Sequence, residues 1–366
     1  MGASRYPEAI AELRRLVQDH PGDADLYARL GRALTADEHL SQAVAEFEHA
    51  LEIDPEDGVT RVDLAVLLTR LDRIPDAEAQ LRNAIARNPQ LASAHRIIGK
   101  LHFREGQYAE ATRAFQRATQ TDADFAEAWF DLAQAYMKQT DLDDAEGAFR
   151  RAVSADSTDA RFRDGLGFVC YKRRQYEAAA IEFVAAVALD PLYARSHFNL
   201  GNTYLRLGRA EEGRQQLETF RALDDQERRL YSLETTILQS PERAGLYHDM
   251  AVIHGQRGEH DKARRRYVQA VLRDSNFAPS YHNLGTMQLR DGRLTEAMGL
   301  FRRALRADST YILAYRSLGN MYMLQKQPAA ALQTYEQGLR RDPSDEDLRA
   351  RAELARKFLR ASGDTR

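Results

Sequence analysis

The chain of 366 residues has a single cysteine, Cys170, and no long run of apolar residues. One cysteine excludes an intrachain disulfide and a metal site built from several thiolates. A membrane-spanning helix needs about eighteen or more consecutive apolar residues, and none are present. The first ten residues also lack the apolar segment of a signal peptide. These absences predict a cytoplasmic protein without membrane insertion, unless a targeting segment has been removed from its N-terminus.

The sequence also lacks an excess of charge of one sign and lacks the common catalytic motifs. A net charge of −3 argues against a broad electrostatic surface for nucleic acid, so no nucleic-acid partner is expected. There is no phosphate-binding Gly-Lys-Ser/Thr loop, no serine nucleophile elbow and no HExxH pair. We therefore expect no cofactor and no independent enzymatic activity.

What the chain does contain is a repeat of 34 residues. Six blocks run without interruption over 24–227, and three more over 244–345. The eighth place of every block is Gly or Ala, and the twenty-fourth place is large and apolar or aromatic. The eighth places are Gly31, Ala65, Gly99, Ala133, Gly167, Gly201, Ala251, Gly285 and Gly319. Small residues at a constant interval predict that two helices approach closely there, backbone against backbone.

Each block carries two amphipathic helical patterns. In block 126–159, Trp129, Leu132, Ala133 and Tyr136 follow the spacing of one helix face, and a second such face begins at Leu142. Gly often stands between the two patterns, where a left-handed residue can close a helix. Several blocks end in Asp-Pro, which stops the second helix. A helix pair this short cannot bury its apolar face alone, so stacking of successive pairs is expected to stabilise the array.

This pattern resembles the tetratricopeptide repeat family, most fully through Trp129-Leu132-Ala133-Tyr136 followed by Ala145, Phe149 and Ala152. The resemblance covers nine repeats. It implies an all-α fold, a right-handed superhelical α-solenoid of helix-turn-helix repeats. It also implies that the first helices line the concave face, with places 2, 5, 6, 9 and 13 of each repeat directed into the groove.

The ends and the interruption of the array have their own patterns. Residues 1–23 match only a second helix and predict a capping half-repeat. Residues 346–366 predict a capping helix and a frayed tail, with a helix start at Ser344 and a packing face that includes Leu348 and Phe358. The insertion 228–243 is helical in pattern. It either starts a new helix near Asp224 or, as we favour, lengthens the preceding helix to about 210–239. In both cases a bend between the two blocks is expected.

The concave places supply the candidate binding residues. Around the sixth repeat they form a basic, amide-rich cluster, because Arg suits carboxylates and Asn can bond a peptide backbone through both donor and acceptor. The candidate groove residues are Arg195, Phe198, Asn199, Asn202, Arg206, Asp131, Asp249, His282 and Asn283.

Two known binding patterns of the family are not matched well. The carboxylate clamp of chaperone-binding members needs Lys where this chain has Phe198. The asparagine ladder of O-linked N-acetylglucosamine transferases is met at Asn199 and Asn283 but replaced by Asp131 and Asp249. His248 and His282 occupy the same place in adjacent repeats, yet no acidic residue completes a metal site, and no metal is predicted.

Cys170 and the motif "GLGFVC" fall in the repeat register, so we interpret both as packing features. The leading hypothesis is a non-catalytic scaffold that binds a peptide or protein segment in its concave groove, with acidic segments as the favoured kind. The alternative is the repeat arm of a larger enzyme, such as a glycosyltransferase, or of a multidomain cell-envelope protein. Homo-oligomerisation stays open.

Overall fold

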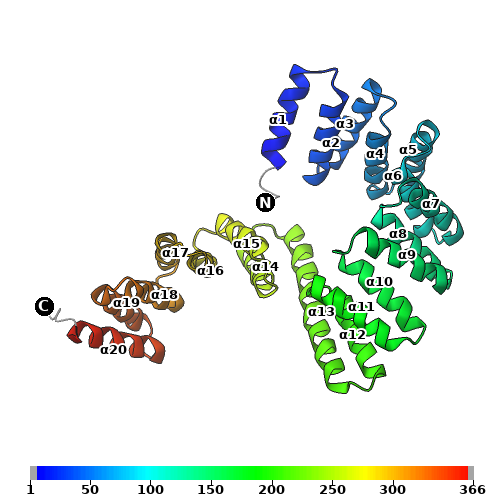
Figure 1. The fold of residues 1–366 in the computed structure, drawn as a ribbon. Coiled ribbons are helices and arrows are strands. Elements are labelled where there is room, and N and C mark those ends of the chain that lie inside the picture. The colour runs from blue at the N-terminus through cyan, green and yellow to red at the C-terminus, as the bar shows by residue number, and fades with distance from the viewer. Residues whose placement is uncertain (1–5, 362–366) are drawn as a thin grey trace. The chain divides into compact units, whose positions relative to one another are not determined.

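The computed structural model describes residues 6–361 and contains, within this range, twenty α-helices and no strands. Figure 1 shows the helices as successive antiparallel pairs. The first helices of the nine pairs are α2 (Ala24–Ala36), α4 (Gly58–Arg70), α6 (Ala92–Arg104), α8 (Ala126–Lys138), α10 (Ala160–Lys172), α12 (Ala194–Arg206), α14 (Ala244–Gln256), α16 (Ala278–Arg290) and α18 (Ile312–Leu324).

The second helices pack against them, and one further helix lies at each end. The second helices are α3 (Leu40–Ile53), α5 (Ile74–Arg87), α7 (Tyr108–Thr121), α9 (Leu142–Ala155), α11 (Tyr176–Leu189), α13 (Ala210–Gln239), α15 (His260–Arg273), α17 (Leu294–Ala307) and α19 (Pro328–Arg341). The terminal helices are α1 (Tyr6–Asp19) and α20 (Glu346–Ala361). The all-α solenoid of helix pairs predicted from the repeat is therefore confirmed.

Each first helix closes with a left-handed residue at the fifteenth place of its repeat. Four of the nine are glycines with φ between 75° and 78°, Gly106, Gly208, Gly258 and Gly292. The other five repeats place Glu38, Asp72, Thr140, Arg174 and Lys326 there, all at positive φ. The turn geometry thus persists where glycine does not, although a side chain in the left-handed region costs about 1 kcal/mol or more.

The eighth-place glycines are explained by the second helix of the same pair. A Cβ on Gly167 would lie 2.8 Å from Cε1 of Phe183, the twenty-fourth-place residue, and Gly99 and Gly285 face Phe115 and Phe301 in the same way. The predicted backbone-to-backbone contact is therefore wrong for these pairs, because an aromatic ring fills the space instead. At Gly201 the atoms nearest to the Cβ position include a backbone atom, the carbonyl oxygen of Gly213, at 3.0 Å.

Other packing predictions are also settled by the helices. Gly165 of the "GLGFVC" motif faces the ring of Phe149, and Cys170 is buried, so both are packing features as expected. The Asp-Pro ends are confirmed, since α3, α11 and α19 stop one residue before Asp54, Asp190 and Asp342. Burial raises the pKa of the Cys170 thiol above its ordinary value.

The insertion lengthens α13 instead of forming a separate helix. This helix runs for 30 residues through Asp224, so the alternative of a new start at that residue is wrong. The carboxylate of Asp224 pairs with Arg228 one turn later. The chain divides within α13 into two compact units, Met1–Leu223 and Asp224–Arg366. A bend between the repeat blocks stays a prediction.

The terminal helices differ from the expectation in two details. The backbone N–H of Leu348 donates to the carboxylate of Asp345 at 2.8 Å, so Asp345 and not Ser344 caps α20. Leu348 and Ala355 are buried on the array, but Phe358 is exposed. At the other end, Ile10 and Val17 bury one face of α1. Residues 1–5 and 362–366, including most of the predicted tail, lie outside the described residues.

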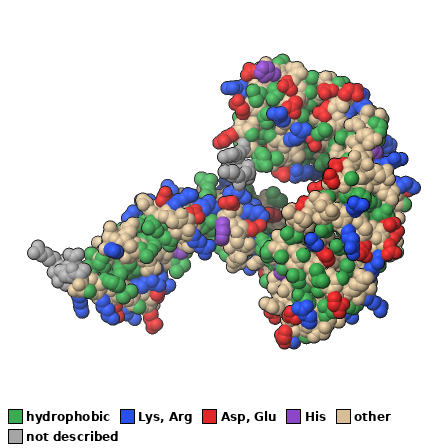
Figure 2. All heavy atoms as spheres, viewed as in Figure 1, with side chains coloured by type: hydrophobic (Ala, Val, Ile, Leu, Met, Phe, Trp, Pro, Cys, Tyr) green, Lys and Arg blue, Asp and Glu red, His purple; other side chains and the backbone are tan. Residues whose placement is uncertain are grey.

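No helix in residues 6–361 is both long and apolar enough to cross a lipid bilayer. Figure 2 shows acidic and basic side chains interspersed over the visible surface, with apolar side chains between them.

The ring-over-glycine contact predicts opposite results for two Gly→Ala substitutions. Gly167→Ala places a methyl group against the fully buried ring of Phe183, so we expect a loss of about 1–2 kcal/mol in the free energy of unfolding. Gly147→Ala in α9 meets no atom within 4 Å, so removal of backbone freedom should stabilise by up to about 1 kcal/mol. Urea unfolding followed by circular dichroism measures both, and equal effects would contradict the contact as the reason for glycine.

Candidate functional site

The first helices of the N-terminal unit carry two adjoining pockets. One has a volume of about 530 Å³ and lies over α4, α6 and α8, and the other has about 400 Å³ and continues over α8, α10 and the start of α12. Both are lined by Phe103, Gln134 and Lys138, so they form one continuous trough. We call this trough the central groove; among the residues that line it are Val66, Ile97, Phe103, Gln134, Phe168 and Arg195.

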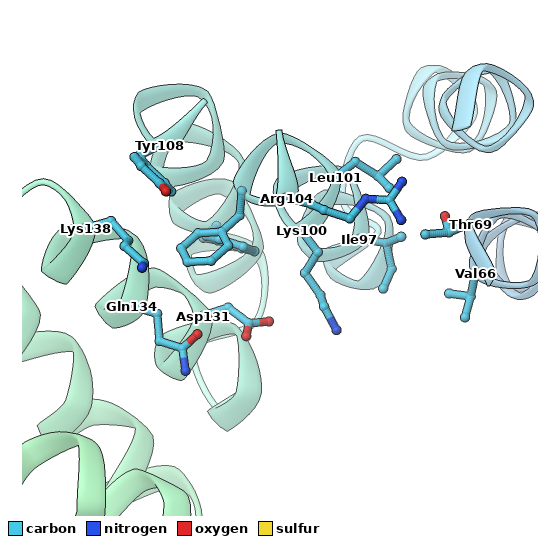
Figure 3. Close-up of a pocket in the computed structure, with 12 residues that line it drawn as sticks. Val66, Thr69, Ile97, Lys100, Leu101, Arg104, Tyr108, Asp131, Gln134 and Lys138 are labelled. Atoms are coloured by element: carbon cyan, nitrogen blue, oxygen red, sulfur yellow. The ribbon is translucent and has the colours of Figure 1, made fainter. Parts of the chain in front are cut away.

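Figure 3 shows the wider pocket of the central groove. Val66 and Thr69 come from α4, and Ile97 and Lys100 from the adjacent α6. Lys100 and Gln134 extend towards the same open side, with Asp131 between them. The side chains of three successive first helices thus meet at one surface.

The repeat register explains why these residues come together. Val66, Lys100, Gln134 and Phe168 are the ninth-place residues of four successive repeats, 34 residues apart. Equal places in stacked repeats lie in a row, so the ninth place forms the row that lines the central groove. The candidates chosen from the sequence omitted all four, although the ninth place was among the predicted concave places. Following that place through every repeat identifies them from the sequence alone.

The floor of the groove is aromatic. Phe103, Phe130 and Phe168 are half-buried and line one or both pockets. Phe130 is held by Phe149 and Phe162, with ring centroids 5.7 and 5.2 Å away. These rings provide apolar surface whose burial by a partner would be favourable.

The two acidic residues of the groove are engaged within the protein. Oδ2 of Asp131 lies 2.6 Å from Nε of Arg96 on the preceding first helix. Asp164 is only 1% exposed, and its Oδ1 accepts from Asn199 at 2.9 Å and from Ser196 at 3.0 Å. Burial raises the pKa of both carboxyls above the ordinary aspartate value, and their Arg and Asn neighbours oppose this.

The predicted cluster of the sixth repeat is only partly open to a ligand. Arg195 lines the groove, but its Nε also lies 3.1 Å from Oδ2 of Asp164. Asn199 is buried, with its amide bound to that same carboxylate. The interpretation of Asn199 as a free backbone-binding amide is therefore wrong, because the neighbouring repeat uses it to satisfy a buried acid.

The other members of the cluster are arranged differently. Asn202 donates at 2.8 Å to the carbonyl oxygen of Phe198 within its own helix. Phe198 is half-exposed and packs against Phe220, with ring centroids 5.1 Å apart. Arg206 is exposed, and its hydrogen bond with Tyr171 raises the pKa of its guanidinium.

The remaining candidates lie in the C-terminal unit. Asp249 is exposed. Asn283 donates at 3.0 Å to the hydroxyl of Tyr267, and both line a pocket of about 360 Å³. His282 is half-buried, with Nε2 2.9 Å from Oγ of Ser317. Within residues 6–361, no group of three or more His, Cys, Asp or Glu side chains is placed to hold a metal ion.

The contacts of Asp164 predict that replacing Arg195 by glutamate destabilises the protein, whereas the same replacement at Arg206 does not. Arg195→Glu removes the cation beside a buried carboxylate and adds a second carboxylate, so we expect a loss of more than about 2 kcal/mol in unfolding free energy. Arg206→Glu, with no acidic partner to lose, should leave the unfolding midpoint unchanged. Urea unfolding followed by the fluorescence of Trp129, the single tryptophan, measures both. Similar midpoints for the two variants would contradict the network.

Burial of His282 predicts a pH-dependent contribution to stability. The ring lies near Phe301 and Tyr311, at centroid distances of 5.4 and 5.6 Å, and this burial lowers the pKa of His282. The unfolded chain therefore binds a proton more readily than the folded one. The stabilisation is present above about pH 6.5 and is lost as the pH falls through the lowered pKa.

NMR titration should accordingly give His282 a pKa below 6.5. His282→Gln should reduce the loss of stability on going from about pH 7.5 to about pH 5.5. His20 is exposed and its side chain makes no hydrogen bond or ion pair with a described residue, so His20→Gln is the matched control variant and should leave that loss unchanged. An ordinary pKa for His282, or an unchanged pH dependence in its variant, would contradict this expectation.

Comparison with known proteins bears on the whole array. A family model described as tetratricopeptide repeat matches residues 34–101, 102–167 and 288–354, and another of that description matches 1–58 and 248–312. A TPR repeat model matches residues 167–208. No match is found among curated proteins.

Solved structures with a similar fold are related only distantly. YrrB, described as a TPR protein with an unusual peptide-binding site, is 22% identical with a TM-score of 0.42, over 48% of this chain and 91% of its own. PilF of Pseudomonas aeruginosa is 21% identical with a TM-score of 0.49, over 60% and 97%. Human IFIT1 is 20% identical with a TM-score of 0.42, over 88% and 73%.

The family models span most of the sequence and agree with the register of helix pairs seen in the structure. The chain belongs to the tetratricopeptide repeat family, whose members generally mediate protein–protein interactions.

Proposed function

We propose that this protein is a non-catalytic interaction scaffold that binds a peptide or protein segment in the central groove. The observation that supports this most directly is the continuity of the two pockets through Phe103, Gln134 and Lys138. A trough that crosses successive first helices offers the same contacts repeatedly along its length, which suits a linear segment better than a compact small molecule. A cytoplasmic location is part of this proposal.

The dimensions of the groove set the length of an extended segment that it can hold. Helices in contact lie about 8–10 Å apart, so the wider pocket of about 530 Å³ extends about 16–20 Å from α4 to α8. An extended chain advances about 3.3 Å per residue, so about five or six residues of a bound segment would span this length.

The groove also offers a polar group for the peptide backbone. The side chain of Gln134 lines both pockets and makes no hydrogen bond with another described residue. Its amide can both donate to and accept from the main chain of a bound segment. The role assigned from the sequence to Asn199 and Asn202 therefore passes to Gln134, because the two asparagines are bonded within the protein.

Filling the apolar end of the groove should weaken binding without altering charge. Val66 lines the wider pocket and is 46% exposed, so Val66→Trp occupies space that a segment would use while leaving the core intact. Peptides would be selected from a displayed random library on the wild-type chain, and their Kd measured by fluorescence polarisation. We expect Val66→Trp to weaken the selected peptides about tenfold, or about 1.4 kcal/mol.

Val184 provides the matched control. It is also 46% exposed but lies on the second helix α11 and lines neither pocket of the groove. Val184→Trp should leave the Kd unchanged. Failure to select any peptide, or equal Kd values for the two variants, would remove the central groove as the binding site.

A further inference from the structure

A row of cations runs along the first helices, and three of its members, Arg104, Lys138 and Lys172, line the central groove. The last residue of the first helix, at the thirteenth place, is basic in five successive repeats. These residues are Arg70, Arg104, Lys138, Lys172 and Arg206. A cation at a helix C-terminus is favoured by the helix dipole, which explains why the place is basic. The dipole does not explain how the five cations differ in their partners.

The first two cations of the row are paired across repeats. Arg70 forms an ion pair with Glu38, and Arg104 lies 4.0 Å from Asp72. Glu38 and Asp72 are the fifteenth-place residues of the preceding repeats, 32 positions earlier in both cases. In these repeats, the acidic residue in the turn after one first helix therefore pairs with the cation at the end of the first helix of the following repeat.

The next three cations have lost this partner. At the corresponding fifteenth places stand Gly106, Thr140 and Arg174, none of which carries a carboxylate. Lys138, Lys172 and Arg206 are exposed and form no ion pair with any described residue. Lys172 lies over the ring of Phe168 at 5.2 Å, and Arg206 bonds Tyr171. We call Lys138, Lys172 and Arg206 the open ladder.

The acids within the groove do not neutralise the open ladder. Asp131 and Asp164 are each bound by an arginine of the protein, Arg96 and Arg195. If either carboxyl is ionised, its own arginine balances it, and if it is protonated it carries no charge. In both states the ladder leaves an excess of positive charge along α8, α10 and α12, near the aromatic floor of the groove.

The spacing of the ladder determines which acidic segment fits. Cα atoms of α8, α10 and α12 approach within 8 Å between neighbours, so the helices that carry the ladder cations are spaced about 8–10 Å apart. A polyproline-II segment advances about 3.1 Å per residue with three residues per turn. Its side chains at every third position therefore lie on one face, about 9 Å apart. In a β-strand, residues three apart point to opposite faces.

We propose that the central groove selects a segment in polyproline-II conformation with an acidic residue at every third position, its carboxylates on Lys138, Lys172 and Arg206. This inference rests on the proposed function, since it names the chemistry of the segment that the groove binds. Exposed ion pairs each contribute about two- to fivefold in affinity, so three in register give about tenfold or more.

The test uses the full chain and labelled synthetic peptides of about nine residues. One peptide has glutamate at every third position with proline and alanine between, and a second has the same composition with adjacent glutamates. A third replaces each glutamate by glutamine. We expect the first peptide to bind about tenfold more tightly than the other two, with a smaller difference at high salt, where exposed pairs are screened.

Thr140→Glu tests the ladder without touching a groove residue. Thr140 already has a φ of 63°, close to the 65° of Glu38, so a glutamate there can adopt the same turn and pair with Lys172. We expect this variant to bind the first peptide two- to fivefold more weakly. Thr140→Gln, which has the same shape without charge, should bind as the wild type does.

The outcomes separate the two proposals. If library-selected peptides bind and respond to Val66→Trp but the three synthetic peptides bind equally, the register is wrong and the proposed function stands. If no peptide of either kind binds, both fail. If a labelled single-stranded oligonucleotide binds more tightly than the first peptide and responds to Thr140→Glu, the ladder is a phosphate site and the peptide assignment is overturned.

Discussion

The contact between the large twenty-fourth-place side chain, a ring in seven of the nine repeats, and the eighth-place glycine or alanine sets the geometry on which the rest of the structure depends. It holds the two helices of a pair at a separation that only a very small residue allows, as Gly167 under Phe183 illustrates. Because the ring is fully buried, it cannot move aside without opening a cavity. Repetition of this contact gives each pair the same shape, and pairs of one shape stack in one manner.

Constant stacking turns positions in the sequence into rows on the surface. Ninth-place residues such as Lys100 and Gln134 bear little of the packing, so they can vary while the array keeps its form. The central groove is therefore assembled from places that the core leaves free. The same separation of roles operates at the turns, where Glu38 and Thr140 adopt nearly the same φ but only the glutamate pairs with the next helix.

Polar contacts between neighbouring first helices decide which of these side chains stay available. Arg32 with Asp63, and Arg96 with Asp131, join successive helices at 2.6 Å. Asp164 forms an ion pair with Arg195 and accepts hydrogen bonds from Ser196 and Asn199, all in the following repeat. A buried carboxyl without such partners would be strongly unfavourable. The arginine, serine and asparagine side chains that bind these carboxyls are therefore not available to a ligand. Where no partner is supplied, as at Lys138, the side chain remains open to one.

The sequence by itself determined the array: the helix pairs, the residue at which each repeat begins and the capping helices. These follow from periodicity, which is local and repeated nine times. The continuous α13 was favoured from pattern alone, but only the structure removed the alternative start at Asp224. Only the tertiary structure decided that a ring and not a backbone lies over Gly167, that Asn199 is committed to Asp164, and that Gln134 is free. Each of these depends on which side chain of another helix lies at the same point in space. The spacing of residues within one repeat does not determine such contacts between helices.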